Sequence, residues 1–217
     1  MFDWIQNRFR KGQPPKAAPI VDLAEIRQSF EQAAGDEEHF PSTIDPRIYH
    51  VQLISRYFGD MNHKWALDAG CGKGRFSRVL QDRNPQAKIA ALDLALAMLH
   101  YAQPPLLPCC GNLTQYPFRD NSFDFVYATE SLEHAVDIEA AVAELCRVLK
   151  PGGKLVVIDK NVEHWGRFKT PRWERWFGRE EMRELLARHC REVSSDFISY
   201  WEDVEPDGLF LAWKAVK

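Results

Sequence analysis

From residue 64 onward, short apolar runs and longer amphipathic stretches take turns along the chain. Runs such as "WALDA" and "FDFVYAT" are typical of strands buried inside a sheet, because they are apolar over the length of a strand. Between them, apolar residues return at helical spacing. The sequence predicts strands at 65–69, 88–93, 106–110, 123–129 and 154–159, and helices near 74–82, 95–102 and 138–149.

The order of these elements predicts the fold class. Strands that alternate with helices form a parallel sheet with helices on both faces, so we expect an α/β protein with a doubly wound, mostly parallel sheet. A helix near 179–189 and two more strand candidates, 194–201 and 208–216, follow. The short connection between these two strands favours an antiparallel C-terminal hairpin at the sheet edge, which brings the expected sheet to seven strands.

The residues before the first expected strand predict an accessory region. We interpret residues 1–40 as an N-terminal helical extension, with a helix near 21–34, and residues 41–217 as the main domain. In "MFDWIQNRFRK", Phe2, Ile5 and Phe9 would share one helical face beside three basic residues. We expect this face to dock on the protein's own domain, and contact with an anionic membrane surface is the alternative.

Composition and charge limit the classes of protein to which this fold can belong. The 217 residues are 45% hydrophobic and carry a formal charge of -3, which gives a sizeable core and no global attraction to nucleic acid. Five cysteines without paired CxxC spacing indicate neither a disulfide framework nor a structural zinc site, and favour a cytoplasmic location. Cys109 and Cys110 are interpreted as buried strand residues. The start lacks the apolar run of a signal peptide, and no stretch approaches the roughly 20 apolar residues of a spanning helix.

The stretch "WALDAGCGKGRFS" joins the first expected strand to a loop with glycine at alternate positions. In a parallel sheet, ligands bind beyond the carboxyl ends of the strands, where this loop lies. Arg75 stands where a dinucleotide fingerprint needs its third glycine, and the Gly-Lys-Ser/Thr of a phosphate-binding Walker loop is missing. The loop resembles motif I of the class I S-adenosylmethionine-dependent methyltransferases, of the type 11 kind.

Four more blocks resemble this family in the same order: "IAALDLALAML", "GNLTQYPFRDNSFDFV", "ATESLEH" and "RVLKPGGKLVV". The resemblance implies a Rossmann-like sheet, S-adenosylmethionine as cofactor and S-adenosylhomocysteine as product. It places Asp68 near the methionine ammonium, Asp93 on the ribose, and Asn112 and Leu113 beside the adenine, with Asn112 replacing the family's usual Asp. The implied cofactor-binding residues are Asp68, Gly70, Cys71, Gly72, Gly74, Asp93, Leu94, Met98, Asn112, Leu113 and Thr129.

The loop after the fourth expected strand carries the candidates for catalysis. Methyl transfer requires an aligned acceptor and, for some acceptors, removal of a proton. His134, with Glu133 beside it, is the favoured proton acceptor. A structural histidine in the next helix is the alternative. The pattern Glu130, Glu133, His134 also resembles metal-assisted O-methyltransferases, and on one helical face the three could hold a divalent metal ion. Whether they bind a metal stays open.

The acceptor must be recognised by other segments, above all "KNVEHWGRFKTPRWERWFG". Its aromatic and basic residues would form a wall for a sugar-bearing or anionic acceptor, or a cover packed on the core. We expect a methyltransferase acting on a small molecule, whether sugar-bearing, lipidic or a biosynthetic intermediate. An RNA methyltransferase and a non-catalytic S-adenosylmethionine-binding protein are the alternatives, and nucleic acid is not the expected partner. The acceptor atom, the pathway and the oligomeric state stay open.

Overall fold

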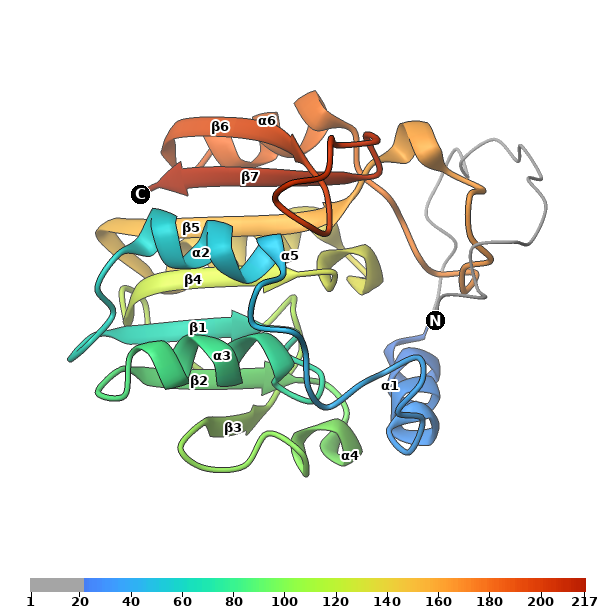
Figure 1. The fold of residues 1–217 in the computed structure, drawn as a ribbon, viewed down its shortest axis with the longest axis horizontal. Coiled ribbons are helices and arrows are strands. Elements are labelled where there is room, and N and C mark those ends of the chain that lie inside the picture. Colours follow the sequence, from blue (N-terminus) through green and yellow to red (C-terminus); the bar gives the residue numbers. More distant parts are fainter. Residues whose placement is uncertain (1–21) are drawn as a thin grey trace.

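The computed structural model describes residues 22–217. Seven strands form one sheet in the order β3-β2-β1-β4-β5-β7-β6 (Figure 1). The first five strands run parallel, whereas β7 lies antiparallel to both β5 and β6. The strands are β1 (Trp65–Ala69), β2 (Lys88–Asp93), β3 (Leu107–Cys110), β4 (Phe123–Thr129), β5 (Leu149–Lys160), β6 (Arg191–Ile198) and β7 (Phe210–Val216).

Helices cover both faces of the sheet. The α-helices of the described residues are α1 (Leu23–Ala33), α2 (Tyr49–Phe58), α3 (Arg75–Arg83), α4 (Leu96–Leu99), α5 (Ile138–Val148) and α6 (Arg179–Ala187). The same residues form two short 3₁₀ helices, η2 (Leu132–His134) and η3 (Val162–His164). The buried residues of α2 and α3 form one core layer with the sheet, and those of α5 and α6 form the other. The central strands are buried on both sides, which explains why their sequences are continuous apolar runs.

The predicted fold class is confirmed, including the antiparallel hairpin. Differences concern the ends of elements: β6 begins at Arg191 instead of 194, and α4 is shorter than the helix expected near 95–102. The helix α2 was missed, although Val51, Ile54 and Phe58 recur at helical spacing and are buried. Residues 1–21, which carry the amphipathic N-terminal stretch, lie outside the described residues, so the division at residue 40 stays a prediction.

The strand β3 corrects one interpretation. Cys109 and Cys110 do lie in a strand, but Cys109 is only partly buried and Cys110 is exposed. The reason is position, because β3 is an edge strand that pairs with β2 alone. Within residues 22–217, no helix has the length and apolar character needed to cross a membrane.

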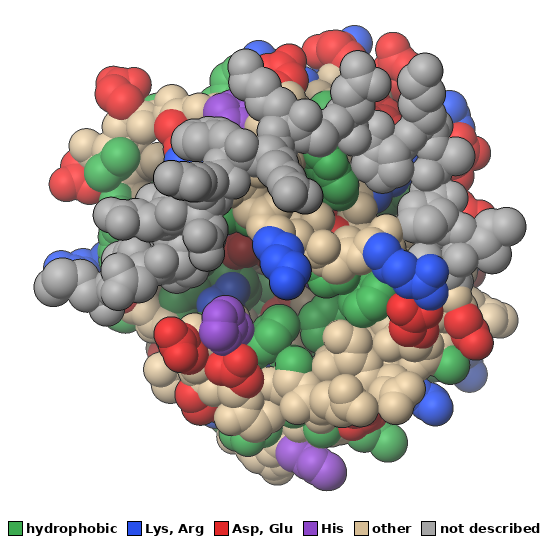
Figure 2. Space-filling view, turned by 90° about the vertical axis from the view of Figure 1, so that its right-hand side faces the viewer, with side chains coloured by type: hydrophobic (Ala, Val, Ile, Leu, Met, Phe, Trp, Pro, Cys, Tyr) green, Lys and Arg blue, Asp and Glu red, His purple; other side chains and the backbone are tan. Residues whose placement is uncertain are grey.

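The carboxyl ends of the parallel strands gather at one edge of the sheet, where α1 also lies (Figure 1). The chain leaves β1 toward β2 on one side, whereas β4 pairs with the other side of β1. This reversal of strand order is where doubly wound sheets place their ligands. Figure 2 looks onto this edge, which is hollowed, with hydrophobic side chains inside the hollow and charged side chains and histidine around it.

Candidate functional site at the carboxyl ends of the strands

The glycine loop after β1 begins the site. Gly70, Gly72 and Gly74 all have positive φ, at 80°, 52° and 76°, which is the left-handed region that glycine enters without strain. At Gly70 there is also no room, since an added Cβ would lie 2.4 Å from the Cβ of Ser131. The Ser131 hydroxyl donates to the carbonyl of Ala69 at 2.7 Å. The loop after β1 is therefore in direct contact with the loop after β4.

Asp93 at the end of β2 holds the glycine loop from the other side. Its carboxylate accepts hydrogen bonds from the backbone N–H of Gly72 at 2.7 Å and of Ala95 at 2.9 Å. Burial raises the pKa of Asp93, and these N–H groups oppose that rise. The structure thus brings Asp93 next to the glycine loop, as the sequence predicts for a ribose-binding residue.

Asp68 in β1 lies beneath the loop and is almost fully buried. It accepts a hydrogen bond from Ser77 Oγ at 2.6 Å, and the same hydroxyl lies 2.5 Å from the Tyr127 hydroxyl. Burial raises the pKa of Asp68 to about 7, and the nearby carboxylate of Asp93 adds to the rise. Asp68 therefore changes charge near neutral pH, and a bound cation would favour its charged form.

Asn112 and Leu113, the residues expected beside the adenine, follow β3, and the implied cofactor residue Leu94 follows β2. Leu94 and Cys110 line a cleft of about 540 Å³. The Asn112 side-chain oxygen accepts from the backbone N–H of Thr114 at 3.1 Å, which leaves one of its two lone pairs for another donor. Leu113 packs beside the core, and its Cδ2 lies 3.7 Å from the position of a Cβ on Gly70.

Three more implied cofactor residues are buried. The Cys71 side chain belongs to the core below α3, so only its backbone belongs to the surface of the loop. Met98 packs with Ala34 and Ala95 under α1. The hydroxyl of Thr129, the last residue of β4, is buried and has no hydrogen-bond partner among residues 22–217.

The turn after β4 gathers a cluster that sequence reasoning did not assemble. Glu130 has a positive φ of 52°, and its Oε1 lies 4.0 Å from His50 Nε2 and 3.7 Å from an Arg75 nitrogen. His50 is fully buried against Phe76 and Tyr200. Within residues 22–217, neither its ring nitrogens nor Glu130 Oε1 has a hydrogen-bond partner. Burial lowers the pKa of His50 to about 4, so the ring is neutral.

A second cluster surrounds the predicted pair Glu133 and His134. The Lys160 ammonium, at the end of β5, lies 2.5 Å from Glu133 Oε1 and 3.4 Å from Glu174 Oε1. Glu133 Oε1 also lies 3.5 Å from His134 Nε2. Burial lowers the pKa of His134 to about 4, and the pKa of buried Asp159, beside Glu133, is raised well above its usual value. His134 is therefore a neutral ring, and burial makes it a weaker base than an exposed histidine.

The expectation that Glu130, Glu133 and His134 share one helical face is wrong. Glu130 turns away before the 3₁₀ helix η2 begins, because its backbone adopts the left-handed conformation. The second carboxylate near Glu133 and His134 is that of Glu174, and the ligand atoms of these three residues lie within 4.8 Å of one another. Lys160 already supplies a cation to two of them, so a metal ion would have to displace its ammonium.

The aromatic and basic segment after β5 is mainly a cover for the core. Trp176 and Phe177 are buried, and Trp165 packs on Trp176 with ring centroids 5.3 Å apart. Its three arginines pair with acidic residues of the protein: Arg167 with Asp207, Arg172 with Glu25 and Arg175 with Glu181.

Lys160 was not assigned to the site from the sequence, although its position in the chain predicts that it lies there. It directly follows the apolar run of β5, so it had to lie at the carboxyl edge. His50 and Tyr200 offered no such signal, because a helix and a hairpin connection bring them in. Glu174 lies in an irregular segment whose path only the fold determines.

The fold is an α/β sheet with a cleft and buried polar groups at the carboxyl ends of its strands, and comparisons with known proteins indicate its family. Residues 67–157 match the family model described as a methyltransferase domain. The chain is 34% identical over 143 residues to malonyl-acyl-carrier-protein O-methyltransferase of Dechloromonas aromatica. This alignment covers 66% of this chain and 53% of that protein. It is 37% identical over 122 residues to demethylmenaquinone methyltransferase of Renibacterium salmoninarum, and this alignment covers 55% of this chain and 51% of that protein.

The matched domain and these relatives support a class I S-adenosylmethionine-dependent methyltransferase. This confirms the family predicted from the motifs, and with it S-adenosylmethionine as the family's cofactor. The chain spans about half the length of the first curated relatives it matches. The solved structure of the cyclase SpnF is also similar, with a TM-score of 0.74, 17% identity and coverage of 93% of this chain and 99% of that chain. At that identity, the similarity is one of fold.

Proposed function

We propose that this protein transfers the methyl group of S-adenosylmethionine to a small molecule that binds at the carboxyl ends of β4 and β5. One observation carries the proposal. The glycine loop touches the turn after β4 through Gly70 and Ser131, so the expected cofactor site adjoins a buried group of titratable side chains. A methyl donor on one side and proton-accepting groups on the other are what an in-line displacement needs.

On the cofactor side, the proposed roles follow the motifs. Asp68 binds the methionine ammonium, Asp93 accepts from the ribose hydroxyls, and the glycine loop passes below the cofactor. Leu94, Met98, Asn112 and Leu113 belong to the adenine end, and the backbone of Cys71 and the hydroxyl of Thr129 complete the lining. The buried position of Asp68 supports its role, because an ammonium group is the natural partner for a carboxylate whose charge is otherwise disfavoured by burial.

On the acceptor side, we propose that the nucleophile loses a proton to His134, with Glu133 and Lys160 orienting that group. The ring is neutral and its Nδ1 has no hydrogen-bond partner among the described residues, so this nitrogen is available to the acceptor. Burial opposes protonation of the ring, and the Glu133 carboxylate, 3.5 Å from Nε2, would stabilise the protonated form. A carboxylate acceptor needs no base, and the arginines after β5 that could bind one are already paired with acidic residues. These features favour a hydroxyl, amine or acidic carbon on an uncharged small molecule.

Two alternatives stay testable. A protein that binds S-adenosylmethionine without transferring its methyl group is consistent with the fold, which the cyclase SpnF shares. An RNA acceptor would need a basic face, whereas three arginines of the most basic segment are held in ion pairs.

The test is incubation of the protein with methyl-labelled S-adenosylmethionine and a cell extract, followed by mass spectrometry of the labelled products. A labelled metabolite supports the proposal, and digestion of the extract with ribonuclease distinguishes an RNA product. The variant His134→Ala should bind S-adenosylhomocysteine normally and transfer methyl about 10² to 10⁴ times more slowly. Binding of the cofactor with no labelled product in repeated extracts would favour the non-catalytic alternative.

A further inference from the structure

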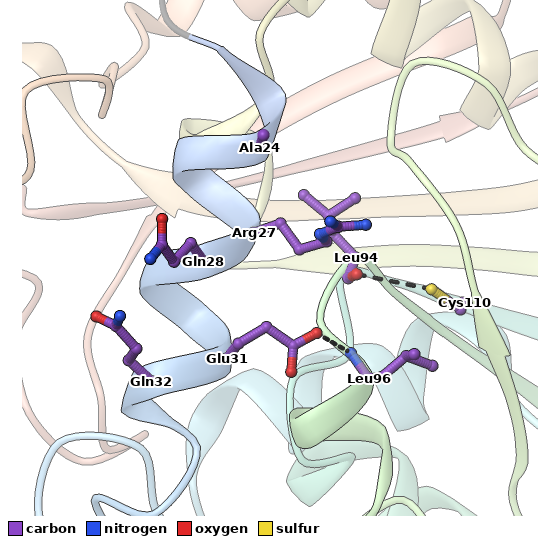
Figure 3. A pocket seen from close by; sticks show the side chains of 8 residues that line it. All are labelled: Ala24, Arg27, Gln28, Glu31, Gln32, Leu94, Leu96 and Cys110. Carbon is purple, nitrogen blue, oxygen red and sulfur yellow. Dashed lines mark hydrogen bonds between the residues drawn. The ribbon is translucent and has the colours of Figure 1, made fainter.

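The helix α1 forms one wall of the cleft at the ends of β2 and β3. The cleft has a volume of about 540 Å³, and Figure 3 shows its lining side chains. One side of the lining comes from α1 and the other from the strand ends: Ala24, Arg27, Gln28, Glu31 and Gln32 face Leu94, Leu96 and Cys110. Leu94 directly follows Asp93, so the cleft adjoins the proposed ribose position.

Glu31 fastens α1 to the far wall of this cleft. Its two carboxylate oxygens accept from the backbone N–H groups of Leu96 at 2.8 Å and Ala97 at 2.9 Å. Figure 3 shows the Glu31 side chain reaching from α1 to Leu96. Next to this contact, Phe30 packs on the small cluster that contains Met98. Polar and apolar contacts therefore hold α1 in one position above α4.

Two ion pairs tie the same segment to the rest of the site. Glu37, just after α1, lies 2.5 Å from the ammonium of Lys73 in the glycine loop. Glu25 accepts from Arg172 of the segment after β5 at 3.0 Å. Phe30 also contacts the His134 ring, with centroids 5.0 Å apart. Thus α1 touches both the cofactor side and the acceptor side.

Arg27 differs from the other charged residues of α1. Within residues 22–217, its guanidinium makes no ion pair or hydrogen bond, and its side chain extends toward Leu94 at the cleft (Figure 3). A guanidinium is flat and weakly hydrated, so it stacks well on an aromatic ring. Leu94 offers the apolar surface for one side of such a ring and Arg27 a flat cation for the other.

We propose that α1 is the outer wall of the adenosine end of the cofactor site, with the Arg27 guanidinium against the adenine ring and Glu31 holding the helix in place. The inference rests on the proposed function, because it requires the adenosine of the cofactor in this cleft. It adds a consequence: the cofactor leaves only when the Glu31 contacts to α4 open. The residence time of the cofactor then depends on a helix that lies outside the methyltransferase motifs.

The first test measures ligand binding by calorimetry with S-adenosylhomocysteine and with 5′-methylthioadenosine, which lacks the amino-acid end. Arg27→Ala should weaken both ligands by a similar factor, about 5 to 30. Arg119→Ala is the control, because Arg119 is exposed and lies before β4 at the opposite edge of the sheet. Unchanged binding in Arg27→Ala, or a loss seen only with S-adenosylhomocysteine, would overturn the contact with adenine.

The second test measures the rate at which S-adenosylhomocysteine dissociates, by stopped-flow fluorescence. Glu31→Gln keeps the size of the side chain but has one acceptor oxygen for two N–H groups, so dissociation should become about tenfold faster. Glu38→Gln is the control, since it removes a charge from an exposed position in the neighbouring segment. An equal rate in Glu31→Gln would refute the holding role. Wild-type protein that binds neither ligand would contradict the proposed function itself, which separates the two failures.

Discussion

The cofactor side and the acceptor side of the site are built in different ways. The cofactor side uses residues at or just after the ends of β1, β2 and β3, and the backbone N–H groups of Gly72 and Ala95 hold the Asp93 carboxylate. The acceptor side uses side chains from α2, α3, the turn after β4, the end of β5 and the segment before α6. A site made by the backbone at strand ends leaves a compact sequence motif, whereas a site made by side chains from several segments leaves none.

The two sides also differ in how they handle buried charge. On the cofactor side, Asp68 is a buried acid and Asp93 a partly buried one, and both have raised pKa values. Hydroxyl and N–H donors hold them, and no ion pair to either is found among residues 22–217. On the acceptor side, the ammonium of Lys160 lies between the carboxylates of Glu133 and Glu174. The first side is prepared for a positively charged ligand, and the second carries its own positive charge.

The largest expected effect tests this difference in stability. Lys160→Met removes the cation between Glu133 and Glu174, and leaving these buried carboxylates unpaired should lower the free energy of unfolding by about 3 to 5 kcal/mol near neutral pH. Urea unfolding measures it. The loss should be smaller at about pH 5, because burial raises the pKa of Glu174, so that this carboxylate takes up a proton more readily there.

Lys169→Met is the matched control, because Lys169 is exposed in the segment after β5. A Lys160→Met protein as stable as the control would mean that the ammonium does not balance these charges. The acceptor side would then have no internal cation, and the contrast between the two sides would disappear.

The next effect tests the cofactor side. Asp93→Ala removes the proposed acceptor for two ribose hydroxyls and a partner of the glycine loop, so the binding free energy of S-adenosylmethionine should weaken by about 2 to 4 kcal/mol. Calorimetry measures it, with Asp82→Ala, an exposed position at the end of α3, as control. Unchanged affinity would place the ribose away from β2.

The cofactor side and the acceptor side also differ in how much of each could be predicted from the sequence. Asp93 was recognised because it ends an apolar run and follows a glycine loop, and the central strands were recognised because burial on both faces leaves continuous apolar stretches. The Glu174 contact with Lys160 depends on the path of an irregular segment, and the burial of His50 depends on where α2 packs. Neither the contact nor the burial can be predicted from local hydrophobic periodicity, because both arise from tertiary packing.

A smaller effect concerns the pH dependence of cofactor binding. In the free protein the pKa of Asp68 is about 7, and a bound ammonium favours the charged carboxylate. Below pH 7 the carboxyl must therefore release a proton on binding, so the affinity for S-adenosylmethionine should fall about tenfold for each pH unit. Calorimetry from about pH 5.5 to about pH 7.5 should show this slope, and Asp68→Asn should abolish it. The same slope in Asp68→Asn would assign the titration to another group.

The smallest expected effect is an absence of change, and it tests whether the acceptor side needs an external cation. The ligand atoms of Glu133, His134 and Glu174 are close enough to hold a metal ion, but the Lys160 ammonium lies 2.5 Å from the carboxylate that all such coordination would use. An ion and an ammonium cannot share that oxygen without strong repulsion. We therefore expect full methyl transfer after treatment with a chelator, measured once a labelled product is known. Activity lost to the chelator and restored by Mg²⁺, Mn²⁺ or Zn²⁺ would show that Lys160 moves aside, and the acceptor side would then depend on a bound cation as the cofactor side does.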